Sequence, residues 1–176
     1  PVPADLIGRS LRGLMVASPS NPAGTMLNRT DLTALIEASG THGASLISDE
    51  IYHGIEYDKK AVSAVEISDD VYVINSFSKY FSMTGWRVGY AGGPAWLIKA
   101  LEILQSQSTS NASSISQAAA VEALNGDTSF LKDWIATLQT RRDIVLEAIA
   151  ASNGVLSAEA PESAFYVYAS CAGAIG

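Results

Sequence analysis

The chain of 176 residues contains one cysteine, Cys171, which excludes an internal disulfide and suits a reducing compartment such as the cytoplasm. None of its apolar runs reaches the about 20 residues that a membrane helix needs. We expect no signal peptide, because no basic segment followed by an apolar stretch opens the sequence. Its 11 Lys and Arg are outnumbered by 18 Asp and Glu, and it lacks the basic stripe of nucleic-acid-binding domains. The two histidines, His42 and His53, lack metal-ligand spacing. We therefore expect a cytoplasmic protein with no metal site and no membrane or nucleic-acid partner.

The composition favours a packed fold. Hydrophobic residues make up 48% of the chain and charged residues 16%, which is typical of a globular core and not of disorder. The length suggests one domain or one and a fraction. Because the chain begins with Pro1 and stops at Gly176 amid small residues, we expect both ends to be cut from a longer protein.

Apolar runs alternate with helical patterns, which predicts an α/β layer fold. We expect strands over residues 14–17, 44–48, 71–74 and 88–93, and a last strand over 164–168. Three of these runs are nearly all apolar, as in strands buried on both faces. Helices are expected over residues 30–39, 94–105, 115–124 and 129–152, with a polar break over 106–114. Thr30 is the expected cap of the first helix, and Gly40 its expected end.

Polar segments follow three of the predicted strands. The segment Ser76-Phe77-Ser78-Lys79 is followed eight positions later by Arg87. A lysine amine can form a Schiff base with an aldehyde, and hydroxyls and a guanidinium can hold a phosphate. The other two segments are Ser48-Asp49-Glu50-Ile51-Tyr52 and Ser18-Pro19-Ser20-Asn21-Pro22-Ala23-Gly24. Doubly wound sheets bind their ligands at such strand ends, so we expect a site for a phosphorylated aldehyde there.

Together, these three segments resemble the class I/II aminotransferases, which are fold type I pyridoxal-phosphate enzymes, and in particular those like aspartate aminotransferase. The resemblance implies that Lys79 forms the Schiff base with pyridoxal 5′-phosphate and then moves the substrate proton. It implies that Asp49 pairs with the protonated pyridine nitrogen, so that the ring accepts electrons from the substrate. Tyr52 and Asn21 are implied to bond the ring hydroxyl. Lys79, Asp49 and Tyr52 are therefore the expected catalytic residues.

The resemblance also supplies the phosphate ligands. Ser76 and Arg87 match the family's phosphate-binding positions, and Ser78 is a weaker match. Two positions depart from the family pattern. Ala23 stands where Thr is more usual, and Ser163 stands where Gly is usual. The departure at Ala23 leaves Asn21 in place.

The resemblance covers nearly the whole chain but only the middle of the family's length. It implies part of a three-layer large domain over residues 1–127, a connecting helix over 128–153, and the start of a truncated C-terminal domain over 154–176. The mixed, mostly parallel sheet would be partial, because the chain is truncated at both ends, and it would expose strand edges that the missing strands normally cover. The intact enzyme would be a homodimer that transfers an amino group between an amino acid and a 2-oxo acid. The isolated piece is expected to be inactive, because the substrate-binding Arg and the Gly-rich phosphate turn are absent.

Other interpretations of the same residues remain open. The motif also fits carbon–sulfur lyases and cyclopropane-forming synthases of the same fold type, and the aminotransferase-like sensing domain of some transcription regulators. A non-catalytic scaffold is less consistent with the complete set of site residues. Glu50 is as compatible with a solvated side chain as with a functional one. We interpret Trp86, Trp96 and Trp134 as packing residues.

Overall fold

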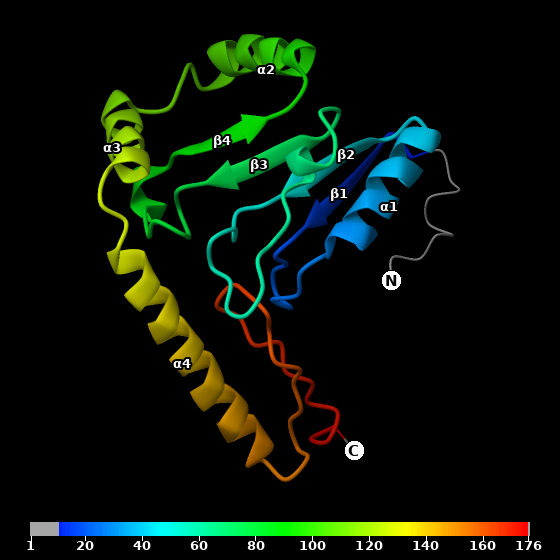
Figure 1. The fold of residues 1–176 in the computed structure, drawn as a ribbon, viewed down its shortest axis with the longest axis vertical. Helices are drawn as coiled ribbons and strands as arrows, with labels where there is room; N and C mark the ends of the chain where they lie inside the picture. Colours follow the sequence, from blue (N-terminus) through cyan, green and yellow to red (C-terminus); the bar gives the residue numbers. More distant parts are fainter. Residues whose placement is uncertain (1–10, 176) are drawn as a thin grey trace.

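The computed structural model describes residues 11–175, and its four strands form one sheet in the order β1-β2-β3-β4 (Figure 1). β1 (Gly13–Ala17), β2 (Ser45–Asp49) and β3 (Tyr72–Ser76) are parallel, and β4 (Gly89–Gly92) is antiparallel to β3. The predicted α/β class with a mixed, mostly parallel sheet is therefore confirmed. All four strands expected between residues 14 and 93 are present, each with slightly different ends.

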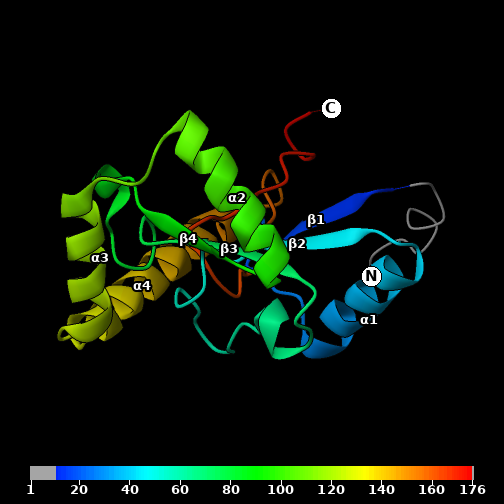
Figure 2. The same ribbon diagram turned by 90° about the horizontal axis from the view of Figure 1, so that it is seen from above.

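Helices lie on both faces of this sheet (Figure 2). The four α-helices are α1 (Arg29–Thr41), α2 (Ala95–Ser108), α3 (Ser114–Asn125) and α4 (Phe130–Ala150). On one face, Leu32 and Leu35 of α1 pack in a buried cluster with Leu46 and Val73 of the strands. On the other face, the ring of Trp96 in α2 lies edge-on to Tyr72 of β3, 6.4 Å between centroids. Because strand side chains alternate between faces, the sheet separates these two layers of helix.

Helix α1 begins earlier and ends later than the sequence pattern predicted. Its N-cap is Asn28, not Thr30, because the Asn28 side chain accepts a hydrogen bond of 2.9 Å from the backbone N–H of Asp31. Gly40 lies inside the helix, and the glycine with a left-handed backbone is Gly43, at φ +66°. The predicted stop at Gly40 was therefore wrong.

Two other expectations along the C-terminal half were wrong. No strand forms over residues 164–168. Ser163, just before this range, makes only an isolated bridge with Glu56. Ala164 adopts a left-handed φ of 59°, which interrupts an extended chain. Helix α2 also continues to Ser108, into the predicted polar break. Serine side chains do not end this helix, since Ser106 and Ser108 satisfy their hydroxyls on carbonyls within it.

The sheet is less covered than its apolar strands predicted. Met15 in β1 is 67% exposed and Ile74 in β3 is 45% exposed, because α2 covers only part of their face. β1 and β4 are the two edge strands, and no strand within residues 11–175 pairs with their outer sides. Trp86 and Trp96 are also exposed, so of the three tryptophans only Trp134 packs against a buried cluster.

Helix α4 leads away from the sheet, and the C-terminal segment returns beneath the sheet edge (Figure 1). The helix lies within the range 128–153 expected for a connecting helix. The predicted domain limits at residues 1 and 176 lie outside the described residues. None of the helices in the described part of the chain is long and apolar enough to cross a bilayer.

Candidate functional site

The seven predicted site residues converge on one edge of the sheet. The ends of the three parallel strands are in register, with Ala17 opposite Asp49 and Asp49 opposite Ile74. The backbone continues this register beyond the strands, where Ser18 donates to the Asp49 carbonyl at 3.1 Å and Glu50 donates to the Ile74 carbonyl at 2.8 Å. The loops that follow β1, β2 and β3 therefore leave the sheet at the same edge, which is the one formed by the carboxyl ends of the parallel strands. Arg87 joins them because the antiparallel β4 begins there.

One part of this edge, which we call the β3–β4 side, consists of Ser76, Ser78, Lys79 and Arg87. The Ser76 hydroxyl lies 2.9 Å from the Ser78 hydroxyl and 3.1 Å from the Val88 carbonyl, and it accepts a hydrogen bond of 3.0 Å from the Ser78 backbone. Arg87 is exposed, has a left-handed φ of 52° and donates through Nη1 to the Thr84 carbonyl at 3.0 Å. Two hydroxyls and a guanidinium thus flank the start of the turn that carries Lys79.

Lys79 is half-buried in the turn after β3. Its Nζ lies 5.9 Å from the centroid of the Phe165 ring. The next residue, Tyr80, packs against the backbone of Gly54, where a Cβ would lie only 2.5 Å from the ring. Gly54 has a φ of +91°, so both its conformation and this close approach require glycine. The loop after β2 is thereby held directly against the lysine turn.

The other part of the edge, the β1–β2 side, consists of Asn21, Asp49, Tyr52 and the newly found Tyr166. Asn21 is exposed in the turn after β1, and its Nδ2 donates to the Tyr166 hydroxyl at 3.3 Å. The Tyr52 ring is 4% exposed, and its hydroxyl is hydrogen-bonded to the same Tyr166 hydroxyl. Asp49 Oδ1 accepts from the Ile51 N–H at 3.1 Å, which fixes the turn between Asp49 and Tyr52.

The Tyr52 phenol resists ionisation in this setting. Burial raises the pKa of Tyr52 far above its usual value, and the hydrogen bond to Tyr166 and the nearby charge of Asp49 raise it further. The amide of Asn21 acts in the opposite direction. Tyr52 is therefore a neutral hydrogen-bond donor or acceptor throughout the physiological pH range.

Comparison with known proteins decides which family has this arrangement. A family model described as aminotransferase class I and II matches residues 5–174. The chain belongs to this aminotransferase family. An aspartate aminotransferase of Rhizobium meliloti (strain 1021) is 43% identical over 171 residues, covering 94% of this chain and 42% of that protein. An aspartate/prephenate aminotransferase of Cereibacter sphaeroides is 42% identical over 165 residues, covering 90% and 41%.

Solved structures agree with the sequence comparison. The crystal structure of the aspartate aminotransferase from Rhizobium meliloti superimposes with a TM-score of 0.87 at 43% identity, covering 92% of this chain and 42% of that one. The chain thus spans about two fifths of the length of the aminotransferases that it matches. The fold type I class predicted from the sequence is confirmed.

Three residues of this candidate site were missed from the sequence. Phe165 and Tyr166 were assigned to a strand, yet the Phe165 ring lies between Lys79 and Tyr52, 5.5 Å from the Tyr52 ring centroid. Their contacts are not readable from the local pattern, since their partners lie more than a hundred positions earlier in the chain. The only local signal was the adjacent aromatic pair itself, directly after Ser163 and Ala164.

Glu50 is the third missed residue, and it is not a solvated side chain. It is only 2% exposed, and its carboxylate accepts hydrogen bonds from the Ser48 hydroxyl at 3.0 Å, the Ser63 hydroxyl at 2.7 Å and the Ala64 N–H at 2.8 Å. The His53 ring nitrogen lies 3.5 Å away. Glu50 therefore ties the end of β2 to the start of the 3-10 helix η2 (Ala64–Glu66), which holds the Asp49–Tyr52 turn.

The segment 161–166 is bound tightly to the Asn21 turn. The Gly24 carbonyl accepts from the backbone of Glu162 at 3.0 Å, from the backbone of Ser163 at 3.1 Å and from the Ser163 hydroxyl at 2.9 Å. Gly24 has a φ of +67°, and a Cβ there would lie 2.5 Å from Pro161 Cβ. Ser163 is fully buried. Its hydroxyl, which the glycine usual at this position in the family would lack, therefore adds a hydrogen bond between the segment 161–166 and the Asn21 turn.

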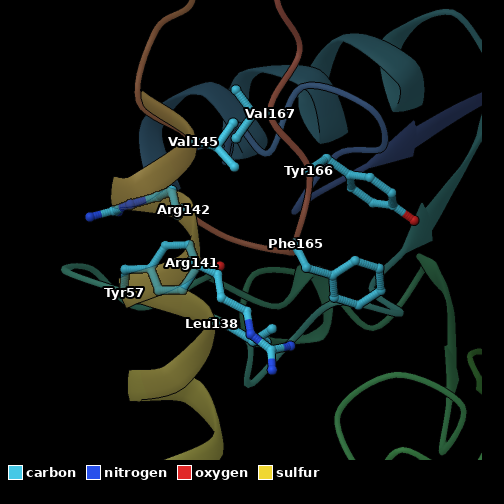
Figure 3. A pocket seen from close by; sticks show the side chains of 8 residues that line it. All are labelled: Tyr57, Leu138, Arg141, Arg142, Val145, Phe165, Tyr166 and Val167. Atoms are coloured by element: carbon cyan, nitrogen blue, oxygen red, sulfur yellow. The ribbon is translucent and has the colours of Figure 1, made fainter. Parts of the chain in front are cut away.

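A cavity of about 470 Å³ lies between this segment and α4 (Figure 3). Val145 and Leu138 of α4 face Val167 and Phe165 across it, and Arg141 projects into it. Arg142, which also lines the cavity, donates to the Pro161 carbonyl at 3.2 Å, and its guanidinium lies 4.6 Å from the centroid of the Tyr57 ring. Helix α4 thus supports the back of the segment, while Tyr166 points away from it toward the strand ends.

Proposed function

We propose that the intact protein is a pyridoxal-phosphate-dependent transaminase that moves an amino group between an amino acid and a 2-oxo acid. The observation that carries this proposal is the convergence of Lys79, Asp49 and the Ser76–Arg87 pair at one sheet edge, in a chain of the class I/II family. A scaffold without catalysis would have no need of a half-buried lysine among these groups. No observation on the described residues specifically favours the lyase alternative or the regulator alternative.

The donors on the two sides of the site suit the two ends of pyridoxal phosphate. On the β3–β4 side, Ser76, Ser78 and Arg87 offer hydroxyls and a guanidinium, which is the donor set of a phosphate site. On the β1–β2 side, Asn21 and Tyr52 converge on a single oxygen, that of Tyr166, as they would on a ring hydroxyl. The residues present therefore fit the cofactor, with Asp49 assigned to its ring nitrogen.

The bound cofactor supplies an electron sink for the charge that develops at the substrate α-carbon. Lys79 would form the covalent link to the cofactor aldehyde and, once displaced by substrate, would accept and return the α-proton. Asp49 would keep the ring nitrogen protonated by its negative charge. Tyr52, which stays neutral, would donate its hydrogen bond without adding a charge. Phe165 would shield Lys79 from water on one side.

The substrates and assembly are inferred from the relatives. Those compared are named aspartate and aspartate/prephenate aminotransferases, so we infer an acidic amino acid as the amino donor. We infer a homodimer for the intact enzyme, a large domain over residues 1–127 and a small domain beginning near residue 154. The 176-residue piece alone should not turn over, because the residues that would grip the substrate carboxylate lie beyond it. A cytoplasmic location remains a prediction, with which the exposed thiol of Cys171 is compatible.

Trapping the cofactor on its lysine tests this proposal. Full-length protein loaded with pyridoxal phosphate and reduced with borohydride should carry the pyridoxyl mass on the peptide containing Lys79. Lys79→Ala should lose both the adduct and transamination, by about 10⁴-fold in rate or more. Lys99→Ala, at an exposed position of α2, is the matched control and should change neither. An adduct on another lysine, or none at all, would contradict the proposal.

A further inference from the structure

The Tyr166 hydroxyl is the point at which Asn21 and Tyr52 meet. Asn21 Nδ2 donates to it at 3.3 Å, and the buried Tyr52 hydroxyl is hydrogen-bonded to it. A phenol oxygen can accept two hydrogen bonds, so Tyr166 satisfies both partners at once. These two partners come from the loops after β1 and β2, while Tyr166 comes from more than a hundred residues later.

Several contacts fix Tyr166 in this place. Two residues before it, the Ala164 backbone donates to the Ile55 carbonyl at 2.9 Å, and Ala164 is fully buried. The Tyr57 hydroxyl donates to the Ala164 carbonyl. The Tyr166 ring itself lies edge-on to the Tyr52 ring, with the centroids 5.5 Å apart. The hydroxyl that meets Asn21 therefore extends from an anchored backbone and not from a loose tail.

We propose that the Tyr166 hydroxyl takes the hydrogen-bonding position which the ring hydroxyl of pyridoxal phosphate requires on Asn21 and Tyr52, so that Tyr166 competes with the cofactor and sets its affinity. This inference rests on the proposed function. The ring oxygen makes the same demand as Tyr166, namely an acceptor between one amide donor and one phenol. Asn21 Nδ2 has a second N–H, but Tyr52 has a single proton to donate. The bond to Tyr166 raises the pKa of Tyr52, which is the effect of a bond in which Tyr52 donates and Tyr166 accepts. With Tyr52 as the donor, Tyr166 has to give up this bond when the ring oxygen binds.

The competition costs the cofactor about one neutral hydrogen bond. An ionised ring oxygen attracts the donors more strongly than a phenol does, so the cofactor wins, but with reduced affinity. Removing the Tyr166 hydroxyl removes the competitor while the ring keeps its packing on Tyr52. Tyr166 is thus a positioning residue that acts on the cofactor through Asn21 and Tyr52.

Pyridoxal phosphate titrations of the full-length protein, stripped of cofactor, test this inference. Tyr166→Phe should lower the dissociation constant of pyridoxal phosphate by about fivefold, which corresponds to one neutral hydrogen bond. The matched control is Tyr168→Phe, since Tyr168 is 69% exposed two positions further along the same segment. It should leave the dissociation constant unchanged. A loss of packing alone would not raise the affinity for the cofactor.

A second measurement uses the same stripped proteins without cofactor. Alkaline ultraviolet titration should show the Tyr52 phenol ionising at a lower pH in Tyr166→Phe, because the Tyr166 hydrogen bond raises the pKa of Tyr52. Tyr168→Phe should leave the ionisation of Tyr52 where it is in the wild-type protein. An unshifted Tyr52 ionisation would overturn the contact on which the inference depends.

The outcomes separate the two proposals. If wild-type protein binds pyridoxal phosphate through Lys79 and Tyr166→Phe binds it equally well or more weakly, the competition is overturned and the transaminase proposal stands. If wild-type protein forms no lysine-linked adduct, the proposed function fails and this inference falls with it.

Discussion

The two sides of the site are built in different ways. On the β3–β4 side, the contacts of Ser76, Ser78 and Arg87 span at most 12 positions of sequence. On the β1–β2 side, Tyr166 is bonded to residues that lie 114 and 145 positions away. The first side is a local turn at the end of a strand pair, and the second is a tertiary junction between the sheet and the segment that follows α4.

This difference has a consequence for rigidity and for exposure. The β1–β2 side rests on buried anchors, since Tyr52, Glu50 and Ser163 are each less than 5% exposed. The β3–β4 side ends in the exposed Arg87, whose left-handed backbone is sparsely populated for residues other than glycine. We therefore expect the β1–β2 side to be preorganised and the β3–β4 side to gain order from its ligand.

The largest expected effect comes from Asp49, which serves the β1–β2 side by charge. Asp49→Asn keeps an acceptor for the Ile51 N–H, now 3.1 Å from Oδ1, and so preserves the turn that places Tyr52. Only the negative charge assigned to the ring nitrogen is lost. We expect kcat for transamination to fall by about 10²–10³-fold, while the borohydride-trapped adduct on Lys79 still forms.

A conservative change elsewhere serves as the control for this experiment. Asp69→Asn alters an exposed loop carboxylate that precedes the start of β3, at the opposite end of this strand from Ser76, and should leave kcat unchanged. Normal turnover in Asp49→Asn would show that Asp49 is only a structural residue of the turn, and its assigned role would be wrong.

The next largest effect concerns the stability of the buried β1–β2 side, which depends on Glu50. Glu50→Ala removes the acceptor of the Ala64 N–H and of two serine hydroxyls, and Ala64 is fully buried. An orphaned buried donor and a lost charged acceptor cost about 3 kcal/mol in the free energy of unfolding. Urea unfolding of the full-length protein, followed by tryptophan fluorescence, measures this loss.

Two further variants sharpen the result at Glu50. Glu50→Gln keeps the shape and one acceptor oxygen, so it should lose less stability than Glu50→Ala. Glu37→Ala removes an exposed carboxylate of α1 and should be close to neutral. If Glu50→Ala were as neutral as Glu37→Ala, the junction between β2 and η2 would contribute nothing to stability.

The sequence predicted well what depends on neighbouring residues. Apolar runs and turn residues located all four strands, and the Ser-rich lysine segment located the β3–β4 side, because each depends on contacts close in the chain. The prediction was wrong over residues 164–168, whose aromatic pattern is typical of a strand. Anchoring at Gly24 and Ile55, with a left-handed Ala164 between, determines that segment instead. No local pattern encodes such anchors.

The same limit explains the misinterpretation of Glu50. A charged residue beside a strand end is usually solvated. Here its burial is made possible by Ser63 and Ala64, which arrive through a loop that has almost no regular structure. Conversely, the apolar strands predicted burial on both faces, yet Met15 is exposed in the described chain. The sequence shows which strand faces are apolar enough to be buried. Which helix or segment covers each face is not encoded in the strand itself.

The smallest effect concerns Arg87, where the two sides can be compared most directly. The left-handed φ of 52° carries strain of about 1 kcal/mol for a residue with a Cβ. Arg87→Gly relieves this strain, while the freedom of glycine in the unfolded chain offsets part of the gain. We therefore expect a slightly more stable protein whose affinity for pyridoxal phosphate is about tenfold lower, since a charged phosphate contact is gone.

For Arg87→Gly we expect stability to rise and cofactor affinity to fall, and a variant at Ser82 supplies the matched control. It is also exposed, has a left-handed φ of 54° and lies in the same loop, but has no assigned ligand. Ser82→Gly should raise the stability in the same way and leave the dissociation constant of pyridoxal phosphate unchanged. If Arg87→Gly also left it unchanged, Arg87 would serve only the turn, through its bond to the Thr84 carbonyl. The phosphate would then depend on the Ser76 and Ser78 hydroxyls and on segments outside this chain, and the β3–β4 side would be a weaker half of the site than its residues suggest.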